Sequence, residues 1–450
     1  MWKLLVVLYS NNLLFASLLC LASLSHAGSL DLSLPEQADE QDVITSEVLT
    51  LNHALARVQA ENPGLAEMQA RAEAMAAIPS QVGSLPDPIV SFNTLNLPTD
   101  TFDVDQEAMT QLQFGISQQI PYPGKLALKE SIAAHIANAA NSSVDETRLQ
   151  LIRDVKTLWW RLFFIDRSID VVEINKTLLR QFIEIAQTKY KVGQGLQQDV
   201  LLAQLELSKL IDRKIQLVST RKQGSARLNA LLNLPTDKAI QLPALTEIDV
   251  ALPALQTASE ILQQTQDNRP ALAEQRLLID AATARQQLAK RDLLPDFTVG
   301  ASYGFRQGND PTGNSRSDLL TVKVAVNMPI FADRKQRMAI SQRHSEVKQQ
   351  QYALQDQWLA IQADITSTIA DYDRTRQQVS LFKTGVIPQA RQTVASMLAG
   401  YQVNKVDFLN LVRAQITLYN YETNLWQTIS EGQSALAKLI ATVGQETIYE

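Results

Sequence analysis

Hydrophobic and polar residues alternate along four short segments of this chain, a pattern typical of β-strands with one apolar face. The clearest segment is FTVGASYGF at 297–305, where apolar and aromatic side chains share one face while Thr, Gly and Ser share the other. LTVKVAVNM at 320–328 and residues 111–120 alternate in the same way, whereas PDPIVSFNTLN at 87–97 is less regular. We therefore predict strands at about 87–97, 110–120, 296–306 and 318–328.

Long helices are predicted between and after the strand pairs. Apolar residues there recur at three- and four-residue steps, as at Leu149, Ile152 and Val155, which is typical of helices that pack along one face. The expected long helices span about 124–190 and 333–400, and a helix of ~65 residues is roughly 100 Å long. Return helices are expected at about 197–232 and 406–442, and shorter helices precede the strand pairs at about 45–78 and 254–292.

The chain repeats this order of elements once. Three stretches recur in sequence order: ENP at 61–63 as DNRP at 267–270, QIP at 119–121 as NMP at 327–329, and YKVGQGLQQDVLLAQ at 190–204 as YQVNKVDFLNLVRAQ at 401–415. Such a long period indicates a duplicated module. We predict a first repeat at 45–240 and a second at 241–450, preceded by an N-terminal extension at 28–44.

Residues 1–27 are predicted to be a cleaved secretory signal peptide. One Lys precedes a mostly apolar run, and Ser25-His26-Ala27 places small residues at the −3 and −1 positions of a cleavage site. An uncleaved anchor is the alternative, although Asn residues at 11–12 interrupt the run. Cys20, the only cysteine, follows Leu19 rather than the small residue that lipoprotein cleavage favours, so lipidation of Cys20 stays open. The mature chain would contain no thiol for disulfides or metal sites.

The predicted strands have the length needed to cross a bilayer. No later stretch approaches the ~20 apolar residues of a membrane-spanning helix, whereas a β-strand crosses with ~9–11 residues. Polar faces suit a water-filled lumen, although a half-exposed soluble sheet gives the same period. Four strands cannot close a barrel, and an open edge in lipid leaves backbone groups unpaired. Three chains would supply twelve strands, so we expect several chains to share one barrel.

Composition and motifs argue against nucleic-acid binding and catalysis. The net charge is −6, whereas nucleic-acid binding requires a basic face. PYPGK at 121–125 lacks the glycine-rich run and the Ser or Thr of a phosphate loop, and the histidines of the mature chain lack ligand spacing. We predict no enzymatic activity, no cofactor and no metal site. One aromatic cluster is interpreted as packing: Trp159, Trp160, Phe163 and Phe164.

These features together resemble a known family. Two repeats of helix, strand, strand and long helix, an Asn followed by Pro near each start, and IPQA at 387–390 ahead of Tyr401 resemble the TolC family of outer-membrane efflux proteins. The resemblance covers about residues 45–445. It implies a homotrimer of α+β chains, with a twelve-stranded outer-membrane β-barrel of four strands per chain, continued by a long periplasmic α-helical barrel. Such a trimer is a passive exit duct that docks with a periplasmic adaptor (a membrane fusion protein) and an inner-membrane pump.

The resemblance also suggests the cargo. Residues 85–125 look most like family members that work with heavy-metal pumps of the resistance–nodulation–division type, so small molecules or heavy-metal cations are expected. A type I secretion duct for polypeptides is the alternative within this class, because the pump selects the cargo. The alternative from another class is a soluble periplasmic coiled-coil adaptor or scaffold, which accounts for the helices but not for the strands.

The two long repeated stretches are predicted to be tips of helical hairpins. Gly193 supplies a permissive backbone and Asn404 can do the same, and a tight connection with no further role is one interpretation. The resemblance implies instead that the tips close the periplasmic end of the duct and contact the adaptor. It assigns the adaptor contacts to Val192, Gly193, Val403 and Asn404.

The resemblance places a gate at the same tips. Asp199 and Tyr401 match positions that hold the entrance shut in the family's type member, and a Tyr hydroxyl donating to a carboxylate is a charge-assisted hydrogen bond. We therefore predict that these two residues latch the tip.

The chain departs from the family pattern beside this latch. Asn410 and Arg413 stand where the type member has the two aspartates of a cation-binding ring, and Val406 replaces an arginine latch. Asp407 is predicted to supply an alternative acidic ring, because threefold symmetry turns one residue into three. On the strands, Lys323 is predicted to face the lumen and to bias ion passage.

Overall fold

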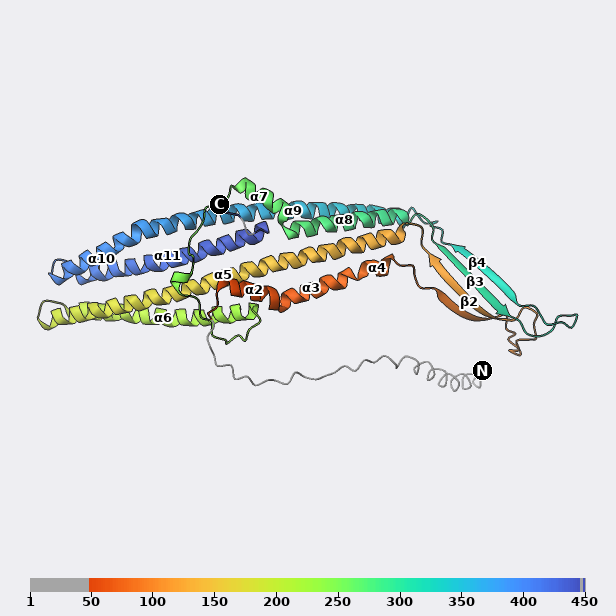
Figure 1. Cartoon of the computed structure of the whole chain (residues 1–450), viewed down its shortest axis with the longest axis horizontal. Helices are drawn as coiled ribbons and strands as arrows, with labels where there is room; N and C mark the ends of the chain where they lie inside the picture. The colour runs from red at the N-terminus through yellow and green to blue at the C-terminus, as the bar shows by residue number, and fades with distance from the viewer. Residues whose placement is uncertain (1–47, 446–447, 450) are drawn as a thin grey trace. The chain divides into compact units, whose positions relative to one another are not determined.

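The structure is a computed structural model that describes residues 48–445 and 448–449. The predicted signal peptide, the lipidation question at Cys20 and the N-terminal extension lie outside the described residues. In the first half, the chain forms α2 (Leu51–Glu61), α3 (Pro63–Ala76), α4 (Ile78–Gly83), β1 (Ile89–Leu95), β2 (Gln111–Ile120), α5 (Lys125–Lys191) and α6 (Gln197–Leu231) (Figure 1).

The second half repeats this order. It forms the 3₁₀ turn η1 (Leu245–Glu247), α7 (Ala258–Asn268), α8 (Pro270–Arg291), β3 (Phe297–Phe305), β4 (Leu319–Val326), α9 (Gln336–Leu381), the π turn η2 (Phe382–Val386), α10 (Ile387–Gln402) and α11 (Phe408–Val443). None of the helices in the described ranges has the length and hydrophobicity needed to cross a membrane.

The prediction of one helix ahead of each strand pair is wrong in both repeats. Asn62 and Arg269 have extended backbones, with ψ of 120° and 116°, and each separates two helices. Each residue precedes a proline, and the proline ring disfavours helical geometry at the residue before it. Pro63 and Pro270 then begin new helices at N1, where the missing N–H has no cost.

The second long helix is also interrupted once. The first repeat's α5 runs for 67 residues without a break, whereas in the second repeat a π turn at Phe382–Val386 separates α9 from α10. Pro388 lies two residues beyond the end of this turn. Its ring cannot donate to the carbonyl of Thr384 and would crowd it in a regular helix, so a wider turn accommodates the proline.

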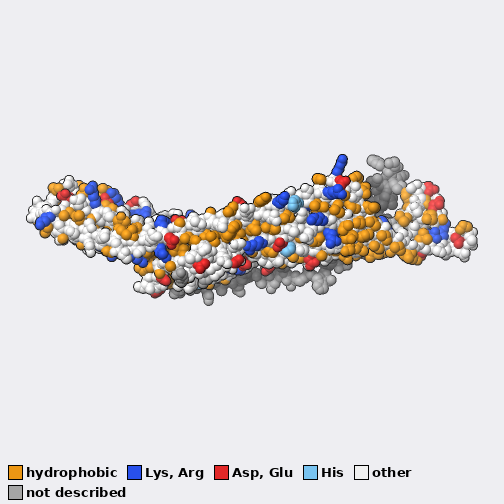
Figure 2. All heavy atoms as spheres, turned by 90° about the horizontal axis from the view of Figure 1, so that it is seen from above, with side chains coloured by type: hydrophobic (Ala, Val, Ile, Leu, Met, Phe, Trp, Pro, Cys, Tyr) orange, Lys and Arg blue, Asp and Glu red, His pale blue; other side chains and the backbone are white. Residues whose placement is uncertain are grey.

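The four strands form one antiparallel sheet in the order β1-β2-β3-β4, so the central pair β2–β3 joins the two repeats. In register, Val90 pairs with Ile116, Ile116 with Ala301 and Ala301 with Val322. Apolar residues therefore form a continuous row across all four strands, and Figure 2 shows hydrophobic side chains gathered over this part of the molecule. Within the described residues, β1 and β4 have no further strand on their outer edges.

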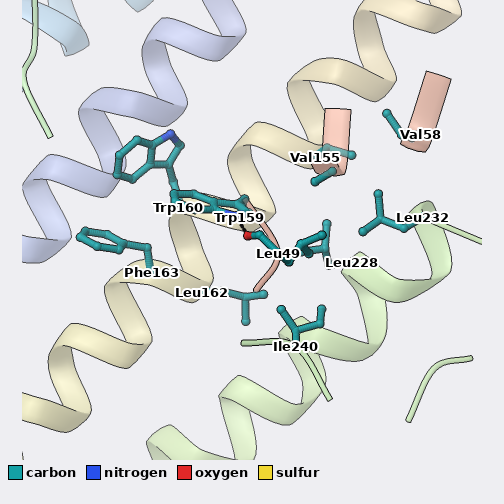
Figure 3. Packing of buried hydrophobic residues seen from close by; sticks show 11 residues of the cluster. Leu49, Val58, Val155, Trp159, Trp160, Leu162, Phe163, Leu228, Leu232 and Ile240 are labelled. Carbon is teal, nitrogen blue, oxygen red and sulfur yellow. Dashed lines mark hydrogen bonds between the residues drawn. The ribbon is translucent and has the colours of Figure 1, made fainter. Parts of the chain in front are cut away.

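The aromatic cluster of α5 lies in a core formed with α2, α6 and the segment after α6 (Figure 3). Trp159 is buried, its indole Nε1 donates to the Leu49 carbonyl at 3.1 Å, and its ring stacks on Phe163 with 6.2 Å between centroids. Trp160 and Phe163 are buried as well, whereas Phe164 is half-buried. The interpretation of this cluster as packing is confirmed.

An ion pair fastens the sheet to the helices where the two repeats meet. Lys125 begins α5 and is buried, and its Nζ lies 2.9 Å from Oδ1 of Asp296, just before β3. The same carboxylate oxygen accepts the backbone N–H of Tyr122 at 2.9 Å, and Lys125 also donates to the Leu294 carbonyl at 3.1 Å. PYPGK at 121–125 thus forms the junction between strand and helix.

Candidate functional site at the hairpin tips

The two tips have the same backbone geometry. Gly193 and Asn404 are in the left-handed region with φ of 73° and 62°. Immediately after them, the N–H of Gln194 donates to the Lys189 carbonyl at 2.8 Å and that of Lys405 to the Gly400 carbonyl at 2.9 Å. This arrangement is the Schellman motif, which ends a helix by pairing its last carbonyls. Equivalent residues of the two repeats therefore occupy equivalent positions.

The predicted adaptor-contact residues are accessible. Val192 and Val403 are each 63% exposed, at matching positions of the two tips. Gly193 and Asn404 are exposed beside them, and no heavy atom lies within 4 Å of where a Cβ on Gly193 would be. An exposed Val next to a tight turn is present in both repeats and is available to a partner.

The predicted latch residues lie together. Tyr401, on α10, is buried, and its hydroxyl donates to Oδ2 of the half-buried Asp199, on α6, at 3.4 Å. The Tyr401 ring packs on Phe408 with 5.1 Å between centroids. Burial, and then the neighbouring Asp199 carboxylate, raise the pKa of Tyr401 to about 12. The hydroxyl therefore stays protonated near neutral pH and can donate this bond.

Lys189 is a third member of this site that the sequence reasoning missed. Its buried ammonium donates to the backbone carbonyl of Tyr401 and, at 3.3 Å, to that of Gln402. It also lies 4.4 Å from the centroid of the Tyr401 ring, a cation–π geometry. A cation at the C-terminal end of α10 interacts favourably with the helix dipole and the unpaired carbonyls. The available signal was that Lys189 aligns with Gly400, immediately before the repeated stretch.

A buried amide pair lies deeper between the hairpins. Nε2 of Gln415, on α11, donates to Oδ1 of Asn175, on α5, at 2.6 Å. The amide of Asn175 in turn donates to the Val171 carbonyl at 2.8 Å. Gln204, the repeat equivalent of Gln415, is exposed. Both Lys189 and Gln415 thus make contacts that their repeat equivalents do not, and these contacts join the first hairpin to the second.

The residues that depart from the family pattern do not join this cluster within one chain. Asp407, Asn410 and Arg413 are exposed. Asp407 is the N-cap of α11, yet its carboxylate makes no capping hydrogen bond. Val406 packs against Gly400. A Cβ added to Gly400 would lie only 2.6 Å from Cγ2 of Val406. The acidic ring at Asp407 stays a prediction.

Lys323 lies on the sheet, in β4, and does not belong to the cluster at the hairpin tips. In β4 it pairs with Gly300 of β3, on the face that carries Thr321, Ser302 and Gly115. This face is opposite the apolar row. In the described ranges, no group of three or more His, Cys, Asp or Glu side chains is arranged to hold a metal ion.

Comparisons with known proteins connect this geometry to one family. Residues 261–445 match the family model described as "Outer membrane efflux protein". Over 173 residues, 38% of each chain, the protein is 28% identical to the cobalt-zinc-cadmium resistance protein CzcC of Cupriavidus metallidurans. It is 22% identical to the alkaline protease secretion protein AprF of Pseudomonas aeruginosa, over 60% of this chain and 56% of AprF. The alignments thus span less than two thirds of the length of these two relatives.

The fold agrees with the sequence matches. The solved outer-membrane channel OprN superimposes with a TM-score of 0.74 at 18% identity, covering 88% of this chain and 89% of OprN. The predicted fold class, four strands and long helices in two repeats, is confirmed. Residues 261–445 thus match an outer membrane efflux protein domain, and 88% of the chain shares the fold of a solved outer-membrane channel.

Proposed function

We propose that this chain is the passive outer-membrane exit duct of a tripartite efflux system, extending from the outer membrane into the periplasm. The observation that carries the proposal is the two-faced sheet at one end of the long helices. Its apolar row includes Val322 and Val324, exposed by 69% and 66%, which suits lipid. Its other face carries Gly, Ser and Thr, which suits a water-filled lumen.

The open edges of this sheet support a trimer. Neither β1 nor β4 has an outer neighbour within the described residues, and lipid cannot satisfy unpaired backbone N–H and C=O groups. Three chains supply twelve strands and close the barrel. The helices then continue the duct to the tips, where Val192 and Val403 would meet a periplasmic adaptor that recruits an inner-membrane pump.

The cargo is proposed to be heavy-metal cations or other small molecules. The similarity to CzcC, whose name states cobalt-zinc-cadmium resistance, favours metal cations. The similarity to AprF, a protease secretion protein, favours the alternative of polypeptide export. A soluble adaptor would leave the exposed apolar face of the sheet unexplained.

Deletion of the gene tests the function. Cells lacking it are expected to accumulate cobalt, zinc or cadmium and to become more sensitive to these cations, because the pump loses its exit. Metal content and growth are measured beside a strain complemented with the intact gene. Unchanged sensitivity to metals and to small toxicants, together with lost secretion of a protein, would instead establish the polypeptide alternative.

Lys323→Glu is expected to shift the channel's ion selectivity toward cations. In a trimer the change would reverse the sign of a ring of charges in the lumen. The reversal potential of purified protein in a planar bilayer under a KCl gradient measures the effect, and Lys323→Gln should give an intermediate value. Identical reversal potentials for all three proteins would show that Lys323 does not face the ion path.

A further inference from the structure

The connection between strand and long helix is longer in the second repeat than in the first. Residues 121–124 lie between β2 and α5, whereas residues 327–335 lie between β4 and α9. The short connection is packed into the chain: Tyr122 is half-buried, and Lys125, which begins α5, is buried against Asp296. The long connection, NMPIFADRK, therefore contains residues that the same step of the fold does not need in the first repeat.

The large apolar side chains of the long connection are exposed. Met328, Ile330 and Phe331 are exposed by 71%, 76% and 72%. Backbone hydrogen bonds close the turn that carries them, since the N–H groups of Arg334 and Lys335 donate to the Phe331 carbonyl at 3.2 Å and 3.1 Å. An apolar patch held on the surface by its own turn marks a site that meets apolar material outside the chain.

This patch continues the apolar face of the sheet. The alternation of apolar residues that begins at Leu320 runs through Val322 and the rest of β4 and continues past the strand to Met328 and Ile330. The run covers residues 320–330, and a β-strand crosses a bilayer in ~9–11 residues. In the proposed duct, Phe331 therefore lies where the hydrocarbon meets the headgroups, a level at which aromatic side chains are enriched.

Cations follow the apolar patch directly. Arg334 and Lys335 are exposed, and neither forms an ion pair with an acidic side chain among the residues that the structure describes. Arg337 is exposed as well and pairs with Asp333 at 2.9 Å. Residues 333–337 thus contain three basic residues and one acidic residue. Figure 2 shows Lys and Arg side chains beside the hydrophobic area of the sheet, at the end nearest the helices.

The loops at the other end of the sheet have the opposite charge balance. Residues 96–110, between β1 and β2, contain four acidic residues and no Lys or Arg, and residues 306–318, between β3 and β4, contain two Arg and two Asp. A surface of lipid phosphates would attract the helix end of the sheet and repel the loop end. Apolar side chains and surplus positive charge therefore occur together only at the helix end.

We propose that the patch formed by Ile330, Phe331, Arg334 and Lys335 binds anionic phospholipid in the membrane leaflet that faces the helices. The two apolar side chains enter the acyl region, and the two cations meet the lipid phosphates. The inference rests on the proposed duct, because it requires the sheet to lie in a membrane, and it adds a lipid preference that a duct does not itself need. Each cation near an anionic surface is expected to favour anionic lipid by roughly fivefold.

Fluorescence quenching by brominated lipid tests the contact. Phe331→Trp in the full-length protein places a fluorescent side chain in the patch, and the protein without this change supplies the background of the other tryptophans. Both are inserted into vesicles of phosphatidylcholine and phosphatidylglycerol in equal amounts, with bromine on the acyl chains of one lipid or of the other. Brominated phosphatidylglycerol is expected to quench the added emission several-fold more than brominated phosphatidylcholine, because the cations concentrate the anionic lipid beside residue 331.

Charge-removing variants identify the residues responsible. Arg334→Gln with Lys335→Gln, added to Phe331→Trp, should abolish the difference between the two lipids and leave quenching itself in place. Arg343→Gln with Lys348→Gln is the matched control, because it removes the same charge from α9 farther from the sheet, and it should keep the difference. Added KCl should reduce the difference by screening, and inorganic phosphate at the same ionic strength should reduce it no further.

The outcomes separate the lipid site from the duct. Equal quenching by the two lipids in Phe331→Trp would overturn the recognition of anionic headgroups, and loss of the difference in inorganic phosphate but not in KCl would assign the cations to free phosphate. No quenching by either lipid, in protein that conducts ions, would mean that a second copy of the chain covers the patch, which overturns the lipid site and leaves the duct in place. Protein that does not insert into the vesicles would overturn both.

Discussion

Tyr401→Phe is expected to raise the open fraction of the hairpin tips roughly tenfold, because a hydrogen bond to a charged group contributes about 1.5–3 kcal/mol and 1.4 kcal/mol is about a factor of ten. We use the low end of this energy range, because the Tyr401 hydroxyl lies 3.4 Å from the Asp199 carboxylate, which is long for a hydrogen bond between two oxygens. Removing only the hydroxyl keeps the ring on Phe408. Single-channel recording in planar bilayers measures the time spent in the higher-conductance state.

Two further variants identify the bond as the cause. Asp199→Ala, which removes the acceptor, should give a similar rise, and the double variant should add little to either single one, because both changes remove the same contact. Tyr190→Phe is the matched control, since Tyr190 is the repeat equivalent of Tyr401 and is 48% exposed. Equal effects of Tyr190→Phe and Tyr401→Phe would leave Tyr401 as a turn residue only.

The latch is also expected to be insensitive to pH across the neutral range. The pKa of Tyr401 is raised to about 12, so the arrangement in which Tyr401 faces Asp199 favours the neutral hydroxyl. Its contribution is therefore fully present below the ordinary tyrosine pKa of about 10 and is lost as the pH rises through about 12. In single-channel recordings, the open fraction of the unmodified protein should stay constant between neutral and mildly alkaline pH. The open fraction of Tyr401→Phe should stay constant over the same range, at its higher value.

Trp159→Ala is expected to destabilise the protein by about 3–5 kcal/mol, the range for truncating a large buried aromatic side chain. Trp159 is 2% exposed and lies in the core shared by α2, α5 and α6. The variant also removes the donor to the Leu49 carbonyl. Unfolding of purified protein by denaturant, followed by circular dichroism, measures the loss.

A graded series checks that packing is the reason. Trp159→Phe keeps most of the buried volume and should cost less than the alanine variant. Phe164→Ala, on the same helix but half-buried, should also cost less. Loss of export by Trp159→Ala with unchanged unfolding would point to a binding role for this cluster and contradict the packing interpretation.

The strands were predictable because the two faces of each strand carry different kinds of side chain, apolar on one face and polar or small on the other. Alternation such as Val322, Lys323 and Val324 follows directly from a face that meets apolar material and a face that meets polar material. The helix breaks were not predicted, although Pro63 and Pro270 were visible. Helical periodicity continues on both sides of these prolines, and only the extended backbones of Asn62 and Arg269 separate the helices.

The site was less predictable than the fold. Asp199 and Tyr401 were identified through the resemblance to a family, since no local pattern relates residues 202 positions apart. Lys189 reaches the Tyr401 carbonyl only because α5 and α10 end side by side. The asymmetry between the repeats, Lys189 against Gly400 and Asp199 against Asn410, is visible in the sequence. What these differences do could not be predicted from the sequence, because it depends on the packing of the first hairpin, which carries Lys189 and Asp199, against the second, which carries Tyr401.

The most direct test of the central claim, that this chain forms an exit duct across the outer membrane, is the current through purified protein in a planar lipid bilayer. A trimer is expected to give discrete conductance steps of one size, because twelve strands would enclose one water-filled lumen. A protein that inserts into no bilayer, carries no current even as the Tyr401→Phe variant, and leaves bacterial membranes with salt alone would contradict it.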